Sequence, residues 1–361
     1  MDIKKIDKAM DFEIKSFDGM DWYSVDAPGF ELDGFYWRSK GGIFRRLPES
    51  VTVSPAVDEL AWHTAGAMVR FCTDAAEIRI SAKLWHNSRM DHMASTGSMG
   101  FDLYVMCGAK KLYCRTTRFD RNNDEYVVTV FGPDAEIKMR EFTLHFPLYC
   151  GVESLQIGIT SGSRLAPPSP WRDSRPVVVY GTSIQQGGCA SRPGMCHTNI
   201  MSRMLNRKFL NFSFSGSAKG ETAIAEALAE IADPAMYILD YDANAQTDGL
   251  EATLSSFIDI LRAKHPAAPI LLVSKLPFAN EFYQPETILP LREKFTLIHK
   301  AELKRRQDAG DTNIYFLDGR FLYGDDPSEC TVDGVHATDF GFYQIAKNMA
   351  PEIERILNIT K

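Results

Sequence analysis

A serine follows a short apolar run in the middle of the chain. In the segment VVVYGTSIQQGG, residues 177–188, four apolar residues lead into Gly181, Thr182 and Ser183. A serine hydroxyl becomes a nucleophile when a neighbouring base removes its proton. A serine in such a place is also a common turn residue or helix N-cap. Ser183 is therefore a candidate nucleophile that needs a base from another part of the chain.

The segment TVDGVHATDFG, residues 331–341, offers such a base. It places Asp333 and His336 three residues apart, just before the predicted final helix. Imidazole is the usual general base near neutral pH, and a carboxylate that holds its tautomer supports it. The alternative is an Asp-Gly turn with a surface histidine. If this loop bends toward Ser183, the three residues form a Ser-His-Asp triad.

Two further segments end in residues that donate hydrogen bonds. FSFSGSAKG (212–220) carries Gly216 after one apolar run, and YILDYDANA (237–245) carries Asn244 after the next. A glycine backbone amide and an asparagine side-chain amide are donors suited to an oxyanion. A turn glycine and a helix-capping asparagine are the alternatives. Together with the amide of Ser183, these two residues form the predicted oxyanion hole.

The elements that would position these residues form a repeating pattern beyond residue 175. Continuous apolar runs alternate with segments of helical spacing, which is typical of a parallel sheet with helices on both faces. In such a doubly wound α/β fold the binding crevice lies beyond the carboxyl ends of the strands. The predicted strands are 176–181, 208–214, 236–241, 269–275 and 313–319, and the predicted helices are 197–206, 220–231, 250–264 and 286–308, followed by a final amphipathic helix with Thr338 as its N-cap.

The first half of the chain has a different period. From about residue 22 to 159, short runs alternate apolar and polar residues, as in EIRISAKL (77–84). Many short alternating strands predict a jelly-roll-like β-sandwich. The proline-rich segment 161–176 then reads as a linker. We therefore predict a β-sandwich domain over 1–165 and an α/β domain over 175–361.

The second half resembles the SGNH hydrolases, also called GDSL-type esterases. GTSI (181–184) is similar to the first family block, with Thr182 where Asp is commoner, and DGVH (333–336) is similar to the last. The third block is usually Gly-x-Asn-Asp, and here it is Asp-Ala-Asn-Ala around Asn244. The resemblance implies an α/β/α, flavodoxin-like domain. The residues that it implies for catalysis are Ser183, His336 and Asp333, with the Ser183 and Gly216 amides and the Asn244 side chain as oxyanion hole.

The first half resembles the β-sandwich that precedes the hydrolase domain in one SGNH subgroup. The likeness lies in MDHMASTGSMGFDLYV (90–105), with its Gly-x-Asp-Leu-Tyr segment, and in GGCASRPGM (187–195). Members of that subgroup are regarded as esterases, often acting on acetylated carbohydrates. The nucleophile elbow of the α/β-hydrolases, Gly-x-Ser-x-Gly, does not fit because residue 185 is Gln.

We therefore predict a serine esterase that hydrolyses short-chain, acetyl esters of carbohydrates through an acyl-enzyme. Two alternatives stay open: an acyltransferase to a sugar or small-molecule hydroxyl, and a carbohydrate-binding protein with an impaired hydrolase domain. Arg192, in an Arg-Pro-Gly turn, and His92 are candidate substrate-binding residues, and Cys189 is predicted to pack. The expected partner is a small-molecule or carbohydrate ester, and the sequence does not fix the oligomeric state.

Composition argues against several other classes. The 361 residues carry 40 Lys and Arg against 47 Asp and Glu, a net charge of −7 without a basic run, so no nucleic-acid partner is expected. No apolar stretch reaches the roughly 20 residues that span a bilayer, so no membrane association is expected. The seven cysteines lack zinc-ligand spacing, and neither a metal nor a cofactor is expected. Without a secretory signal, we expect a cytoplasmic protein, or a secreted or periplasmic one whose signal was removed.

Overall fold

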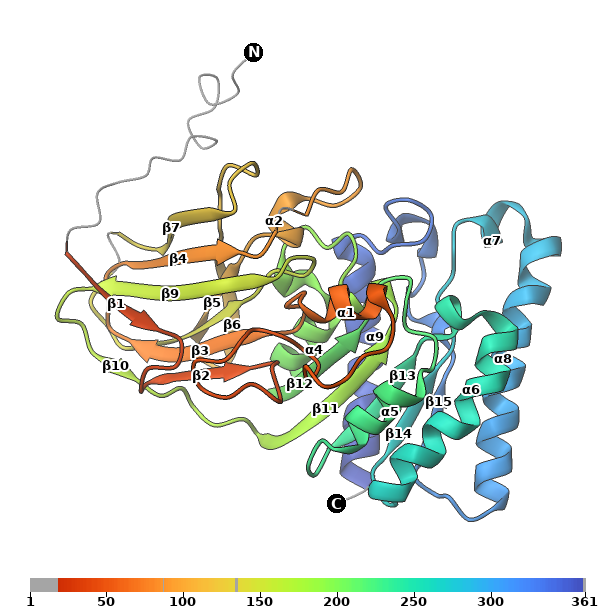
Figure 1. The fold of residues 1–361 in the computed structure, drawn as a ribbon. Helices are drawn as coiled ribbons and strands as arrows, with labels where there is room; N and C mark the ends of the chain where they lie inside the picture. Colours follow the sequence, from red (N-terminus) through yellow and green to blue (C-terminus); the bar gives the residue numbers. More distant parts are fainter. Residues whose placement is uncertain (1–18, 87, 134–135, 360–361) are drawn as a thin grey trace.

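The computed structural model describes residues 19–86, 88–133 and 136–359, which form two units joined side by side (Figure 1). The strands of the first unit are β1 (Met20–Ser24), β2 (Phe30–Asp33), β3 (Met68–Thr73), β4 (Ile78–Leu84), β5 (Asp102–Cys107), β6 (Lys110–Thr116), β7 (Glu125–Phe131), β8 (Arg140–His145), β9 (Val152–Thr160) and β10 (Leu165–Ala166), and its helices are α1 (Pro55–Ala61) and α2 (Ser95–Ser98). The strands of the second unit are β11 (Asp173–Gly181), β12 (Arg207–Ser213), β13 (Met236–Asp240), β14 (Ile270–Val273) and β15 (Ile314–Leu317). Its helices are α3 (Ser183–Gln186), α4 (His197–Leu205), α5 (Thr222–Ala229), α6 (Asp242–Lys264), α7 (Asn280–Tyr283), α8 (Pro285–Asp308) and α9 (Asp339–Ile359).

Two antiparallel sheets make up the first unit. One has the order β1-β9-β4-β7 and the other β10-β3-β8-β5-β6, with β2 paired beside β3. Strands β1, β9, β4 and β7 opposite β3, β8, β5 and β6 follow the order of an eight-stranded jelly roll. The alternating sequence accounts for the sandwich, because the residues of β4 that point inward are all apolar and buried: Ile78, Ile80, Ala82 and Leu84. They share one core with apolar residues of β3, β5, β8 and β9.

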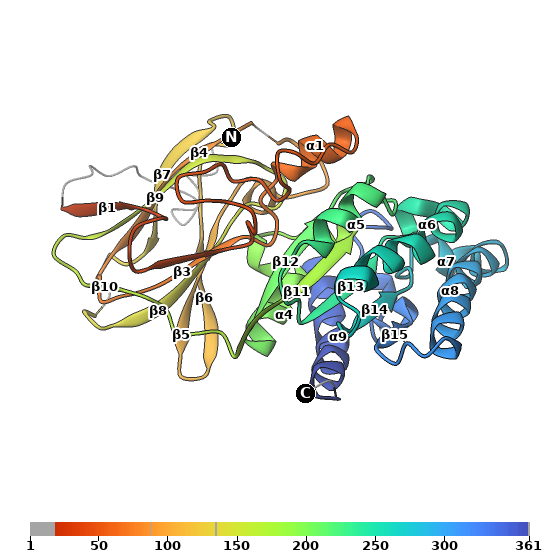
Figure 2. The ribbon, with the colours of Figure 1, turned by 60° about the horizontal axis from the view of Figure 1, so that its bottom comes forward.

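A five-stranded parallel sheet forms the centre of the second unit. Its order is β12-β11-β13-β14-β15, which is the flavodoxin-like order. Helices α4 and α9 pack on one face, and α5, α6 and α8 pack on the other (Figure 2). Strand β11 is buried from Pro176 to Gly181, as a strand covered on both faces must be. The predicted doubly wound α/β domain behind a β-sandwich is thereby confirmed.

Every predicted strand and helix of the second unit is present. Helix α9 begins at Asp339, and Thr338 caps it, because its hydroxyl accepts a hydrogen bond from the Gly341 amide at 3.1 Å. Helix α6 begins at Asp242 rather than near 250, and it bends at Gln246, whose φ is 59°. Among the described helices, none is long and apolar enough to cross a membrane.

Residues 167–172 connect the two units. Leu165 and Ala166 still pair with β3, and β11 already begins at Asp173, so the connection is shorter than the segment 161–176. Trp171 in this connection is buried, and its Nε1 donates to Asp33 at 3.0 Å. The connection is therefore anchored to the sandwich at Trp171, and by the Ser169 amide, which donates to Glu141 at 3.0 Å.

The two units also touch around the carboxyl ends of β11 and β12. The buried Arg46 of the sandwich donates to the main-chain oxygens of Asn211 and Ser213, at 2.9 and 2.8 Å. The Tyr149 hydroxyl donates to the main-chain oxygen of Ser183 at 3.2 Å. The sandwich therefore borders the strand ends at which the sequence places its candidate catalytic residues.

Candidate active site

Ser183 opens the single-turn helix α3, directly after β11. Thr182 is the N-cap: its hydroxyl accepts from the Ile184 amide at 3.3 Å, and Gln185 Oε1 accepts from the Thr182 amide at 2.9 Å. Gly187 ends the turn with a φ of 105°, in the left-handed region that glycine adopts without strain. Because Thr182 performs the capping, the Ser183 hydroxyl is left for another partner. The alternative of Ser183 as a helix cap is thus excluded.

That partner is His336. Its Nε2 lies 2.9 Å from Ser183 Oγ, and its Nδ1 lies 2.7 Å from Asp333 Oδ2. The second oxygen of Asp333 accepts from the backbone amides of Val335 and His336, at 3.0 and 2.7 Å. Burial raises the pKa of Asp333, but these hydrogen bonds outweigh it and hold the pKa at about 2. The structure thus brings together the three residues predicted as a triad, with the acid in its carboxylate form.

The loop after α3 leaves little space beside this triad. A Cβ on Gly188 would lie 2.9 Å from the Tyr149 hydroxyl and 3.2 Å from Cδ2 of His336. Ser183 itself is only 8% exposed. Residue 188 must therefore be glycine for the sandwich and the catalytic loop to meet over the serine.

Gly216 lies in the turn after β12, with a φ of 66°. Within the described residues, neither its amide nor that of Ser183 donates to another protein atom. The preceding residue is fixed, since the Ser215 amide donates to Gln186 Oε1 at 3.0 Å. The turn therefore presents a free amide close to α3, as an oxyanion hole requires.

Asn244 belongs to the first turn of α6. The N-cap of that helix is Tyr241, so Asn244 does not cap it. Its Nδ2 donates to the main-chain oxygen of Phe214 at 3.3 Å, which ties it to the turn that carries Gly216. Only one of its two N–H groups is used in this way, and the other is available to a substrate.

Gln186 is a residue of the site that sequence reasoning missed. It is completely buried, and its Nε2 lies 3.2 Å from both Leu148 O and His63 Nδ1 of the sandwich. Its Oε1 holds the Ser215 amide beside Gly216. The side chain therefore links the sandwich to the predicted oxyanion hole. The available signal in the sequence was a pair of glutamines directly after the apolar Ile184, at the predicted rim of the crevice.

The Gly-x-Asp-Leu-Tyr segment receives Arg192. The guanidinium donates to Asp102 at 2.7 Å and to the Tyr104 hydroxyl at 2.5 Å, and it lies 4.0 Å from the Tyr113 ring centroid. The Gly194 amide also donates to Asp102, at 2.9 Å. Arg192 is therefore held at the junction of the two units, and its contact with substrate stays a prediction.

His92, from the sandwich, lies beside the triad. Its ring centroid is 5.6 Å from that of His336, and its Nδ1 is 3.2 Å from Asp91 Oδ1. Cys189 lies there too, and it is 7% exposed and part of the second unit's core, as predicted for a packing residue. Both residues therefore belong to the surroundings of His336, and a substrate contact of His92 stays a prediction.

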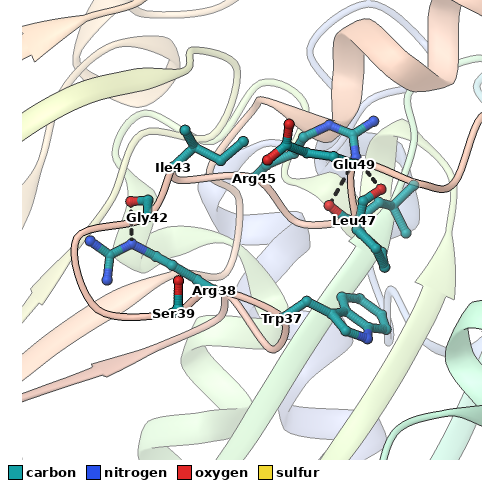
Figure 3. A pocket seen from close by; sticks show the side chains of 9 residues that line it. Trp37, Arg38, Ser39, Gly42, Ile43, Arg45, Leu47 and Glu49 are labelled. Carbon is teal, nitrogen blue, oxygen red and sulfur yellow. Dashed lines mark hydrogen bonds between the residues drawn. The ribbon is translucent and has the colours of Figure 1, made fainter.

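A hollow of about 90 Å³ lies elsewhere, in the 37–49 segment of the sandwich (Figure 3). Its two arginines are engaged: Arg38 pairs with Asp26 at 2.7 Å, and Arg45 donates to the main-chain oxygen of Leu47 at 2.9 Å. None of the predicted site residues lines it. The hollow is therefore separate from the triad.

Two family profiles match the chain. The GDSL-like lipase/acylhydrolase family matches residues 174–354, and the Gly-x-Asp-Leu-Tyr N-terminus of SGNH-hydrolase-type esterases matches residues 20–165. The comparison with curated proteins gave no match. Because the first profile spans half of the chain, the protein belongs to the GDSL-like lipase/acylhydrolase family, and it is an esterase by class.

Solved structures share the two-unit architecture. A GDSL-like lipase from Bacteroides ovatus is 27% identical with a TM-score of 0.83, over 94% of this chain and 98% of that one. The salicylyl-acyltransferase of a tetracycline biosynthetic pathway is 16% identical with a TM-score of 0.74, over 94% and 98%. A family two carbohydrate esterase from Cellvibrio japonicus is 12% identical with a TM-score of 0.59, over 95% and 99%. At these identities the last two show the fold alone.

Proposed function

We propose that the protein hydrolyses acetyl esters of carbohydrates, with Ser183, His336 and Asp333 as its triad. The observation that carries this proposal is the hydrogen-bond chain Asp333–His336–Ser183, with contacts of 2.7 and 2.9 Å. The chain lies at the carboxyl end of β11, where doubly wound sheets bind their ligands. Each residue thus has the partner that its role requires.

The reaction follows from these contacts. His336 Nε2 takes the proton of Ser183 Oγ as this oxygen attacks the ester carbonyl, and it then gives the proton to the departing alcohol. Water enters next, gives its proton to His336 and attacks the acyl-enzyme. Ser183 leaves as the carboxylic acid forms and recovers its proton from His336. Asp333 stabilises the imidazolium in both halves.

The oxyanion of each tetrahedral intermediate needs donors that are already in place. The amides of Ser183 and Gly216 and the second N–H of Asn244 have no other acceptor among the described residues and can supply them. Such fixed donors favour the transition state because they do not reorganise as charge develops.

The crowding around Ser183 supports a short acyl group. Ser183 and Cys189 are each under a tenth exposed, and Gly188 is pressed between Tyr149 and His336. An acetyl group needs little room beside such a nucleophile, whereas a long chain needs a continuous apolar groove. The fold shared with a carbohydrate esterase supports a sugar as the alcohol part of the ester substrate.

The test is a hydrolysis panel of aryl esters of rising acyl length and of acetylated polysaccharides, assayed by acid release. Acetyl esters should have a higher kcat/KM than octanoyl esters. Ser183→Ala should lower kcat by about 10⁶-fold and abolish labelling by a fluorophosphonate probe, whereas the exposed Ser328→Ala should change neither. More than a tenth of wild-type kcat in Ser183→Ala, or a preference for octanoyl esters, would refute the triad or the acyl length respectively.

Acyl transfer is the second candidate. It is favoured by the likeness of almost the whole chain to an acyltransferase fold. The same acyl-enzyme would pass its acyl group to a sugar or small-molecule hydroxyl instead of water. Product analysis with acceptor alcohols separates the two, since transfer yields a new ester in place of free acid.

A further inference from the structure

A second histidine and a thiol lie within metal-binding reach of His336. One ligand atom from each of His92, Cys189, Asp333 and His336 lies within 4.8 Å of the others. In a tetrahedral zinc site, metal–ligand distances of about 2.0–2.3 Å place two ligand atoms about 3.3–3.8 Å apart. Side-chain movements of about 1 Å would therefore bring the cluster around one ion.

Both histidines have the hydrogen-bond partners of metal ligands. His336 Nδ1 donates to Asp333 at 2.7 Å, which leaves the lone pair on Nε2, where it accepts the Ser183 proton. His92 Nδ1 lies 3.2 Å from the carboxylate of Asp91, which leaves the lone pair on its Nε2 as well. A carboxylate that accepts from the far nitrogen orients a histidine toward a metal.

Cys189 supplies the thiol. Its φ of 74° lies in the left-handed region that favours glycine, and it follows two glycines, so a cysteine at this position carries backbone strain. In the described part of the chain its sulfur has no hydrogen-bond partner. A metal ion that binds the sulfur displaces the thiol proton, as zinc-class ions do.

We propose that His336, His92 and Cys189 together bind a divalent cation of the zinc class, and that this ion inhibits the enzyme. The ion forms bonds to the two Nε2 atoms and to Cys189 Sγ, and the thiol proton leaves to water. Asp333 stays the acceptor of His336 Nδ1. A metal-bound Nε2 has no lone pair for the Ser183 proton, so acylation stops. The inhibition rests on the proposed function, whereas the binding does not.

The other histidine cluster of the described chain does not fit a metal as well. One ligand atom each of Glu59, His63 and His86 also lies within 4.8 Å of the others. Gln186 Oε1 accepts from a backbone amide, so its Nε2 is the donor that faces His63 Nδ1 at 3.2 Å. His63 Nε2 then carries the ring proton and has no lone pair for an ion. This cluster serves as the control site.

The test titrates the chelator-treated, full-length protein with Co²⁺ and Zn²⁺, with and without ester substrate. Wild type should show a thiolate-to-cobalt charge-transfer band at one equivalent and loss of hydrolysis with Zn²⁺, reversed by EDTA. Cys189→Gly, which suits the positive φ, and Cys189→Ser should lose the band. Both variants, and His92→Gln, should bind Zn²⁺ at least about tenfold more weakly.

Matched controls separate the possible outcomes. Cys107→Ser, which removes an exposed thiol, and His86→Gln should behave as wild type. Ser183→Ala should keep the cobalt band while lacking hydrolysis, so metal binding is measured even if the proposed reaction is mistaken. A cobalt band that persists in Cys189→Gly, or zinc binding that disappears with His86→Gln, would overturn the site.

Discussion

The two oxygens of Asp333 have separate tasks. Oδ2 accepts from His336 Nδ1, and Oδ1 accepts from the backbone amides of Val335 and His336. Between them Gly334 adopts a φ of 88°, which lets the loop fold back on the carboxylate. The acid is therefore oriented by its own loop. This is the physical reason why an Asp and a His three residues apart suffice to activate a serine that is distant in sequence.

Asn244 is the residue at which the chain departs most from its family, and its role can be tested directly. We predict that Asn244→Ala lowers kcat by about 10²–10³-fold with little change in KM, because the donor acts where charge develops. Asn244→Asp should lower kcat at least as much, since a carboxylate repels the oxyanion. Kinetics on an acetyl ester, beside the melting temperature of each variant, provide the measurement.

The structure has already excluded the competing role as a cap, which belongs to Tyr241. If the Asp variant nonetheless keeps near-normal rates, Asn244 is not an oxyanion donor. The role of Asn244 would then be structural, through its hydrogen bond to the main-chain oxygen of Phe214.

At the scale of elements, α3 and the turn after β12 are held together by Gln186. We predict that Gln186→Met lowers kcat on acetyl esters by about 10–100-fold while KM changes less, because the turn carrying Gly216 loses its tether. The unpaired Ser215 amide and Leu148 oxygen should also lower the free energy of unfolding by about 1–3 kcal/mol. Steady-state kinetics and urea unfolding measure the two effects.

If Gln186 had only a structural role, the substitution would lower the free energy of unfolding without lowering kcat. In that case Gln186→Met would unfold more easily, but at a temperature where it is fully folded it would turn over as wild type. An unchanged kcat would therefore remove Gln186 from the positioning of the oxyanion hole.

The long elements were predictable from sequence because their buried apolar residues follow a regular spacing along the chain. Strand β11 is apolar from Pro176 to Tyr180 because helices cover both faces there, and α9 repeats its apolar residues on one side. The short helix α3 was not predictable, since four residues show no period, and Thr182, Gln185 and Gly187 hold it by local hydrogen bonds. The early start of α6 is not predictable because residues 242–249, DANAQTDG, are small and polar and show no apolar period.

The site was predictable in part for a related reason. Ser183, Asp333 and His336 stand at the ends of elements and have few structural uses there, so their residue types suggest chemistry. The partners of Arg192 were not predictable, since they lie about ninety positions earlier in the chain, at Asp102 and Tyr104. Contacts between distant segments leave no pattern in a single sequence.

At the scale of the whole molecule, the sandwich is a supporting wall of the candidate site. Tyr149 reaches the main chain of Ser183, Arg46 holds the end of β12, and Gln186 reaches back to Leu148. The two units should therefore unfold in a single transition, and hydrolytic activity should be lost in the same transition. A sandwich that served only to bind substrate would not need these contacts.

Arg192 tests that coupling. Asp102 is fully buried, and burial raises its pKa even though Arg192 opposes this effect. We predict that Arg192→Ala lowers the free energy of unfolding by about 3–5 kcal/mol, because it removes the direct ion-pair partner of a buried carboxyl and leaves only the more distant Arg203. Arg172→Ala, which breaks a surface pair with Glu354, should cost less than about 1 kcal/mol.

Adding Asp102→Asn to Arg192→Ala should restore part of this loss, since an amide needs no counter-charge and still accepts from the Gly194 amide. Urea unfolding of the four members of the cycle gives the coupling. If Arg192→Ala and Arg172→Ala lowered the free energy of unfolding equally, the stability of the junction would not depend on the pair of Arg192 and Asp102.

Three buried histidines make the folded protein sensitive to acid. Burial lowers the pKa of His63 and of His197 to about 3, with Arg46 and His86 adding to the effect at His63. Burial, and next Arg203, lowers the pKa of His145 as well. All three must stay neutral in the folded protein, whereas in the unfolded chain a histidine takes up a proton near pH 6.5.

We therefore predict that the contribution of these histidines to the free energy of unfolding is fully retained above about pH 6.5 and falls as the pH is lowered toward about 3, because only the unfolded chain binds these protons in that window. Each histidine contributes a slope of up to about 1.4 kcal/mol per pH unit. His197→Gln should reduce the slope by that amount. Phe342→Leu, which removes the ring stacked on His197, should lower stability at every pH and leave the slope unchanged. Urea unfolding from pH 7 to 4 measures both, and an unchanged slope in His197→Gln would show that this histidine is not held neutral.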